Sequence, residues 1–241
     1  MNLTLAAVLM GFAAVLGGAT GFGSSLVSTP LLLLAGFALP QVVPLNLTAT
    51  LVTRLAVLVR LRGSVNWPRV ALLGVASLPG ACIGALTVHL VPARYLKIAA
   101  GVLVVLAGLR MLIRMPARAG GGRVRPVVAG VIGGYLSTTT SLNGIPPALL
   151  LTASDVPQRN FLADLAGFFV CCNAISLAVL AFQGAVPAEV LLPALPVLTG
   201  AAVLGNLLGG FVGERLPPVL FRRLVVALIV VSGLVTVIGA F

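Results

Sequence analysis

The sequence predicts an all-α integral membrane protein of about eight transmembrane helices in two four-helix repeats. Hydrophobic residues make up 60% of its 241 residues and charged residues only 8%, whereas a soluble domain carries roughly a quarter charged residues. Its long charge-free stretches exceed the about 20 apolar residues that a helix needs to cross a bilayer. Because these stretches do not alternate between apolar and polar residues, they indicate helices rather than the strands of a barrel. Among them are 1–53, 126–154 and 165–188.

The first half, residues 1–114, holds four predicted helices. Glycine and proline clusters, which break helices, separate or interrupt them. The helices are Leu3 to about Phe37 with an interruption at Gly17–Ser25, about Gln41 to Arg60, Pro68 to about Leu90, and about Arg94 to Arg114. A linker at 115–126 follows, and its three consecutive glycines and three arginines predict an aqueous segment.

The second half, residues 127–241, repeats the first. The run from Pro30 to Gln41 aligns with that from Pro147 to Gln158. Four crossing helices per half would give both halves the same orientation, so we expect a parallel repeat. The predicted helices are about Val127 to Thr152 with an interruption at Ser137–Gly144, about Pro157 to Phe182, about Ala188 to Val212, and Pro217 to Ala240.

Charge and motif content exclude several classes of function. The net charge is +11, but the basic residues mainly flank apolar segments, as orientation signals and headgroup contacts do. We therefore expect the lipid bilayer as a partner and no nucleic acid. The three cysteines and one histidine lack the spacing of a metal site, and no serine has a predicted base within reach. We expect no enzyme activity, metal or cofactor.

The two interruptions fall at corresponding places in the halves and form the predicted binding site. Freed backbone groups cannot face lipid, and paired breaks of this kind mark the substrate sites of transporters. A half-helix that begins there presents unpaired N–H groups and a positive dipole end to an anion. The alternative is that the hydroxyls only cap the half-helices. The candidate substrate-binding residues are Gly21, Phe22, Gly23, Ser24, Ser25, Thr139, Thr140, Ser141, Asn143 and Gly144.

Three polar residues inside predicted helices extend this site. Arg54 lies roughly 9 Å from Arg60 at helical rise, and we interpret it as an anion counter-charge or gate, or as an arginine that snorkels. Asn46 is a binding candidate on the same helix, with interhelical hydrogen bonding as the alternative. Asp164 is a proton-coupling candidate, or else a structural partner of Arg54 or Arg159.

Several motifs resemble the sulfite exporter TauE/SafE family. They are Gly21-Phe22-Gly23 followed by Pro30-Leu-Leu-Leu-Leu, the Gly63-Ser-Val-Asn66-Trp67 connection, and Gly80-Ala-x-x-Gly84. The resemblance implies a bundle of about eight helices that exports sulfite, sulfoacetate or related organosulfur anions. Family members commonly carry a Gly-Phe-Gly-Gly-Gly-type run in both halves. This chain has Ser24-Ser25 in the first and Thr-Thr-Thr-Ser-Leu-Asn-Gly at 138–144 in the second, which predicts a more polar pocket.

These observations predict a secondary transporter, and more specifically an exporter, of a small sulfur-containing or organic anion such as sulfite, sulfoacetate or another sulfonate. The expected location is the bacterial cell inner membrane, as a multi-pass protein, and a homodimer is a further expectation. A passive anion or small-solute channel is one alternative. A non-transporting membrane scaffold subunit is another.

Overall fold

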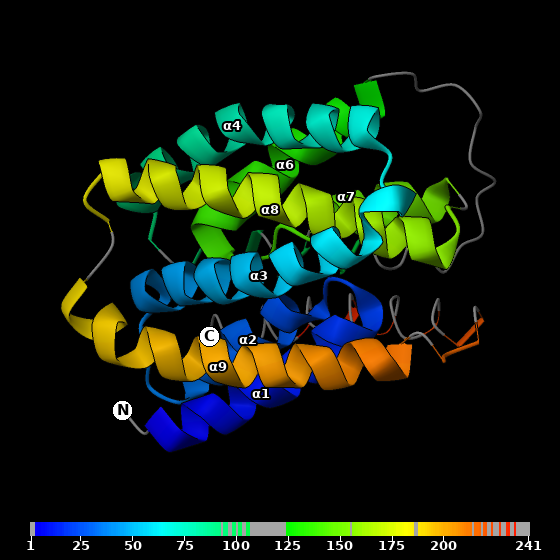
Figure 1. Cartoon of the computed structure of the whole chain (residues 1–241). Helices are drawn as coiled ribbons and strands as arrows, with labels where there is room; N and C mark the ends of the chain where they lie inside the picture. The colour runs from blue at the N-terminus through cyan, green and yellow to red at the C-terminus, as the bar shows by residue number, and fades with distance from the viewer. Residues whose placement is uncertain are drawn as a thin grey trace.

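The computed structural model describes residues 3–92, 124–154, 156–185 and 188–213, together with scattered residues between 94 and 106 and between 215 and 234. The four main ranges are helical apart from short connections, which confirms the all-α prediction (Figure 1). A short 3-10 turn at Arg62–Ser64 joins α3 to α4. The α-helices are α1 (Leu3–Thr20), α2 (Gly23–Leu34), α3 (Leu39–Leu61), α4 (Trp67–Leu90), α6 (Val124–Thr140), α7 (Ile145–Ala153), α8 (Gln158–Phe182) and α9 (Ala188–Gly213).

Five helical segments in the described ranges are long and apolar enough to cross a membrane, so the chain is a multi-pass membrane protein. They are Leu3–Thr20, Leu39–Ser64, Trp67–Val88, Gln158–Phe182 and Pro193–Gly213. The predicted helices at 94–114 and 217–240 lie mostly outside the described residues, and the count of eight stays a prediction. Most of the predicted linker also lies outside them, although α6 already begins at Val124.

Each predicted interrupted helix is a helical hairpin instead of a single broken crossing. A Cβ placed on Gly17 would lie 2.5 Å from the Cβ of Ser24, and Leu32 of α2 belongs to the same buried cluster as Ala6 near the start of α1. The second helix, α2, therefore runs back along α1. In the other half α7 likewise returns along α6 (Figure 1). There the carbonyl oxygen of Asn143 lies 3.3 Å from the Cβ position of Gly133.

Glycines bring two pairs of parallel helices into backbone contact. Along the α4–α6 pair, a Cβ on Gly130 would meet the carbonyl of Leu73, and one on Gly134 would meet that of Ser77. The α1–α9 pair has the same kind of backbone contact, and successive contacts lie further toward the C-terminal end of both helices. Small residues permit this close approach in lipid, where packing rather than the hydrophobic effect holds helices together. The contacts of the second pair are Gly205 on Gly11, Gly209 on Val15 and Gly213 on Ala19.

The helices α3 and α8 run antiparallel, which contradicts the predicted parallel orientation of the two halves. The sequence alignment makes α3 and α8 counterparts, yet Leu39 at the start of α3 packs in one cluster with Leu180 at the end of α8. At the other end Leu61 shares a cluster with Phe161. The prediction treated each hairpin as a single crossing, whereas each hairpin reverses the direction of the chain. In the sequence alignment α1 corresponds to α6 and α9 corresponds to α4. The α1–α9 contact is therefore matched by the α4–α6 contact, as in an inverted repeat.

Candidate functional site

The two breaks meet in the interior of the helix bundle. A Cβ on Gly144 of the second break would lie 3.0 Å from the Cβ of Phe22 in the first and 2.6 Å from Cζ of Phe169 on α8. A hydrogen bond of 2.9 Å joins the hydroxyls of Thr29 on α2 and Ser141 in the second break. The structure thus brings together the segments that the sequence singled out.

The first break is the turn between α1 and α2. Gly21 has a φ of +89°, a conformation that L-side chains rarely adopt, and its N–H donates to the carbonyl of Gly17 at 2.8 Å. The hydroxyl of Thr20 accepts the N–H of Gly23 at 3.2 Å, which satisfies one of the free donors at the start of α2. The chain therefore reverses here with its backbone largely paired.

Arg54 reaches this turn from α3. Its Nη2 donates to the carbonyl of Gly17 at 2.8 Å, at the end of α1 where the helix dipole is negative. Its guanidinium carbon lies 5.7 Å from the ring centroid of Phe169, within cation–π range. The side chain is 1% exposed, so it packs between helices and does not snorkel toward the interface.

The pairing of this cation is incomplete. Nε of Arg54 has no hydrogen-bond partner, and within the described ranges the residue forms no ion pair with a carboxylate. Burying an arginine in a membrane protein is costly unless a partner or water compensates its charge. Among the described residues, the charge of Arg54 is met only by the carbonyl of Gly17 and the ring of Phe169.

The first turn of α2 adds neutral donors next to this cation. Ser24 is buried beside Gly17, the residue whose carbonyl holds Arg54, and the Oγ of Ser24 has no hydrogen-bond partner. Ser25 follows and is buried as well. The start of a helix also carries a positive dipole end, so α2, Ser24 and Arg54 together form a buried, electropositive site.

Asn46 instead completes a hydrogen-bond network that ties the breaks to α3. Its Oδ1 accepts the hydroxyl of Ser28 at 2.7 Å, and its Nδ2 donates to Thr29 at 3.0 Å and to Ser141 at 3.3 Å. Both amide hydrogens and the carbonyl oxygen are therefore engaged. This arrangement favours the alternative of interhelical hydrogen bonding for Asn46 and Ser141 over ligand binding.

We expect Asn46→Leu to lower the free energy of unfolding by about 1–3 kcal/mol, because it removes the shared partner of three buried hydroxyls. Thr48→Val is the matched control, since among the described residues the hydroxyl of Thr48 bonds only to the carbonyl of Pro44 in its own helix. Thermal unfolding of the purified variants measures both effects. Equal midpoints for the two variants would contradict a bridging role for Asn46.

A second cluster of polar side chains surrounds the break between α6 and α7. Nδ2 of Asn143 donates to Oδ1 of Asn173 on α8 at 2.6 Å and lies 3.3 Å from the hydroxyl of Ser137. The Nδ2 of Asn173 and the hydroxyl of Ser176 have no partner, although both residues are fully buried. Asn173 thus adds an unpaired donor on α8 near the second break.

The hydroxyls of Thr139 and Thr140 in the second break bond to their own helix. The hydroxyl of Thr139 donates to the carbonyl of Tyr135 at 2.8 Å, and that of Thr140 donates to the carbonyl of Leu136 at 3.2 Å. Both side chains are buried. For these two residues the structure favours the alternative, in which hydroxyls satisfy backbone groups at a helix end.

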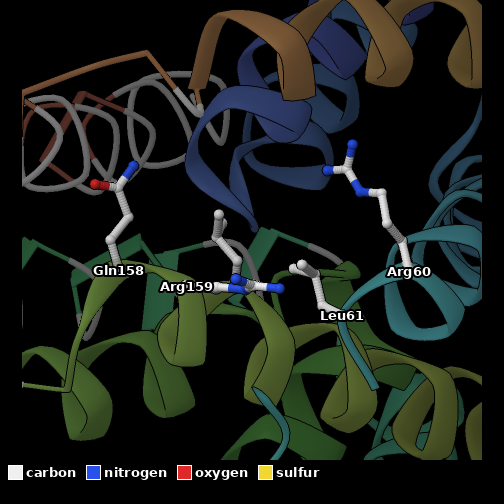
Figure 2. Close-up of a pocket in the computed structure, with 5 residues that line it drawn as sticks. Arg60, Leu61, Gln158 and Arg159 are labelled. Atoms are coloured by element: carbon white, nitrogen blue, oxygen red, sulfur yellow. The ribbon is translucent and has the colours of Figure 1, made fainter. Parts of the chain in front are cut away.

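An open pocket lies between the end of α3 and the start of α8. Its volume is about 480 Å³, and it is lined by Arg60, Leu61, Gln158, Arg159 and Leu162. Figure 2 shows Arg60 on one side of this pocket and Gln158 and Arg159 on the other. None of these residues belonged to the predicted site.

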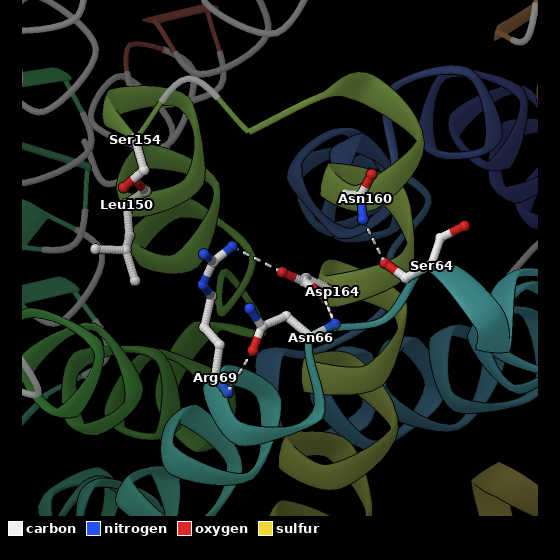
Figure 3. Close-up of polar contacts among 7 residues, drawn as sticks. All are labelled: Ser64, Asn66, Arg69, Leu150, Ser154, Asn160 and Asp164. Atoms are coloured by element: carbon white, nitrogen blue, oxygen red, sulfur yellow. Dashed lines mark hydrogen bonds and ion pairs between the residues drawn. The ribbon is translucent and has the colours of Figure 1, made fainter.

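Asp164 lies outside the central site and ties α8 to the connection before α4. Its Oδ2 is 2.9 Å from Nη1 of Arg69, and its Oδ1 accepts the N–H of Asn66 at 2.7 Å. Nearby, Asn160 donates to the carbonyl of Ser64 (Figure 3). The partner of Asp164 is therefore neither of the two arginines that the sequence suggested. These contacts favour a structural role.

A double-mutant cycle tests that role. Asp164→Asn and Arg69→Gln should each destabilise the protein by about 1–3 kcal/mol, because each leaves the other group without its ion-pair partner. The double variant should be no less stable than the worse single variant, since the two residues act as one unit. Fully additive losses in thermal unfolding would show that the residues do not depend on each other.

Comparison with known proteins agrees with the sequence resemblance. A family model described as "Sulfite exporter TauE/SafE" matches residues 5–236, which is nearly the whole chain. No curated protein and no solved structure gives a significant match.

Proposed function

The chain belongs to the sulfite exporter TauE/SafE family, whose members are membrane transporters, and from this premise we propose that it is a secondary transporter of a small sulfur oxyanion. Sulfite and short organic sulfonates are the proposed substrates, and export is the proposed direction. The observation that carries the proposal is Arg54, a buried cation with an unpaired Nε placed where two breaks meet. The absence of a nucleotide-binding motif in the sequence favours a gradient as the driving force.

Charge balance favours a singly charged substrate. One guanidinium, one hydroxyl and one helix start face the proposed site, and the remaining free donors are the neutral groups of Asn173 and Ser176. A sulfonate or bisulfite ion would supply the missing acceptor for Arg54 and Ser24 with charge-assisted hydrogen bonds. Sulfate would bring a second negative charge that no described cation in the centre offsets.

Two aromatic rings would contact the rest of the substrate. Phe22 is 1% exposed and Phe169 is fully buried, and both adjoin Gly144 at the meeting of the breaks. Such walls suit a methyl or short alkyl group attached to the sulfonate, because apolar surface gains by leaving water. A polar head and an apolar wall at one site fit an organosulfonate better than an inorganic anion.

The buried centre supports alternating access. Arg54, Ser24 and Asn143 are all nearly inaccessible, so solute could reach them only if the helices around the breaks moved. In transporters built from inverted repeats, one part of the bundle rocks against another around a fixed central site. We infer that the structure corresponds to an occluded arrangement of such a cycle.

Flux measurements in reconstituted vesicles test the proposal. Labelled methanesulfonate and sulfite should enter vesicles that carry the protein with saturable kinetics and should exchange with internal substrate, while sulfate and zwitterionic taurine should compete poorly. Empty vesicles provide the background. Electrical currents far above transporter turnover would indicate a channel instead. Absence of both flux and substrate-dependent thermal stabilisation would refute anion transport.

A further inference from the structure

The amide of Asn173 has one free donor in the interior of the helix bundle. Its side chain is fully buried on α8, and its Oδ1 accepts the Nδ2 of Asn143 at 2.6 Å. This hydrogen bond fixes the orientation of the amide, because Oδ1 must face Asn143. The Nδ2 of Asn173 is then left without a hydrogen-bond partner. A buried N–H without an acceptor costs free energy and is an exception in native proteins, so a ligand that supplies the acceptor would account for it.

This donor adjoins the place where the two breaks meet. Asn143 precedes Gly144, whose Cβ position lies 2.6 Å from Cζ of Phe169. Asn173 follows Phe169 by four residues on α8, and side chains at that spacing are neighbours on one helix face. The guanidinium carbon of Arg54 lies 5.7 Å from the centroid of the Phe169 ring. The buried cation and the free amide donor therefore both adjoin the same aromatic side chain.

The surroundings of Asn173 provide no counter-charge for a second anionic group. The second break, at 140–144, contains no basic residue, and neither does α8 after Arg159. An amide N–H can donate to a carbonyl, hydroxyl or ether oxygen without the burial of another charge. A buried carboxylate, by contrast, is costly without a cation beside it. The group that suits the free N–H of Asn173 is a neutral acceptor.

We propose that Asn173 is a specificity-determining residue of the central site and selects sulfonates that carry a neutral hydrogen-bond acceptor, such as a carbonyl oxygen, at the other end of the molecule. This inference rests on the proposed function, because it takes Arg54 and Ser24 as the partners of the sulfonate group. The short carbon chain lies against Phe169, and the acceptor receives the free N–H of Asn173. Asn143 is a positioning residue, since it holds the amide in the required orientation.

A matched pair of ligands tests this selection on the purified protein. Acetonesulfonate and isobutanesulfonate have the same charge and nearly the same shape, but only acetonesulfonate carries a carbonyl oxygen. Thermal-unfolding titrations give the apparent affinity for each ligand. The wild-type protein should bind acetonesulfonate about fivefold more tightly, as expected for one hydrogen bond to a donor that is already out of water.

Replacing Asn173 should abolish the preference and leave sulfonate binding in place. In Asn173→Leu the two affinities should agree within about twofold, and isobutanesulfonate should bind about as tightly as it does to the wild-type protein. Asn173→Ala, which adds no bulk, should give the same result. Asn46→Leu is the matched control, because it removes a buried amide whose hydrogen-bonding groups are all engaged within the protein. It should lower stability but keep the preference.

Two results would overturn the assignment of Asn173. One is equal affinity of the wild-type protein for the two sulfonates. The other is a preference for acetonesulfonate that persists in both Asn173 variants. Failure of the proposed function gives a different result, because neither sulfonate would then stabilise the wild-type protein or enter vesicles that contain it. That outcome would overturn the proposed function and the role of Asn173 together.

Discussion

Arg54→Gln is expected to reduce transport of methanesulfonate at least about 100-fold while the protein stays folded. The substitution removes the only described cation at the meeting of the two breaks. In a buried site, a hydrogen bond to a charged group contributes about 1.5–3 kcal/mol, and leaving a buried anion without a counter-charge costs more. Initial rates of labelled uptake in reconstituted vesicles, at equal protein content, measure the effect.

Stability separates a binding role for Arg54 from a purely structural one. Glutamine is two atoms shorter than arginine and loses the bond to the carbonyl of Gly17, but it also removes the cost of a buried charge without an ion-pair partner, so the unfolding temperature should change by only a few degrees. Arg54→Lys keeps the charge but loses the planar fork of donors, and we expect intermediate transport. Parallel loss of stability and transport in both variants would show that Arg54 only holds the helices together.

Gly80→Val is expected to prevent assembly of the α4–α6 pair. A Cβ on Gly80 would collide with the carbonyl oxygen of Val131, so the two helices would have to move apart and lose the other close backbone contacts of the pair. Overpacking of a well-packed interior costs about 1–3 kcal/mol even where side chains can adjust, and here the obstacle is backbone. The expected result is loss of most monodisperse protein in size-exclusion chromatography, with a lower unfolding temperature for any that remains.

Gly200→Val is the matched control for this prediction. It adds the same side chain to a helix, but a Cβ on Gly200 meets nothing within 4 Å, and the residue is exposed. Its yield and stability should match those of the parent protein. Similar behaviour of the two variants would mean that the glycine contact between α4 and α6 does not determine assembly.

The helices could be predicted well because hydropathy and helix breakers report them directly. The predicted segment from Gln41 to Arg60 corresponds to α3 (Leu39–Leu61), and that from Pro157 to Phe182 corresponds to α8 (Gln158–Phe182). Proline near the start of each fixed the boundary, since proline is tolerated in the first turn and disfavoured further inside.

The direction of the chain within each break could not be read from composition. Gly21 in the first break and Ser141 in the second adopt positive φ values, and such turns reverse the chain, but glycine also occurs where helices merely kink. Length was the available signal. The predicted helix from Leu3 to Phe37 is much longer than the about 20 residues that one crossing requires, and a hairpin of α1 and α2 accounts for the excess.

The candidate site was partly predictable for the same reason. Glycine-rich breaks marked the place, and the unpaired Nε of Arg54 and Oγ of Ser24 both lie there. Side-chain partners across helices were not predictable, because a single sequence carries no information about which helix faces rotate toward each other. The pairing of Asp164 with Arg69 and the fully engaged amide of Asn46 are both of this kind.

The central claim is that the two breaks enclose an anion beside Arg54. Crystals grown with 2-bromoethanesulfonate test it most directly, because anomalous scattering locates the bromine without reference to any model. We predict a peak in contact with Phe22 and Phe169, with the sulfonate density within hydrogen-bonding distance of Nε of Arg54 and Oγ of Ser24. Well-ordered crystals with bromine only at the protein surface, and Nε of Arg54 bonded to protein alone, would contradict the account.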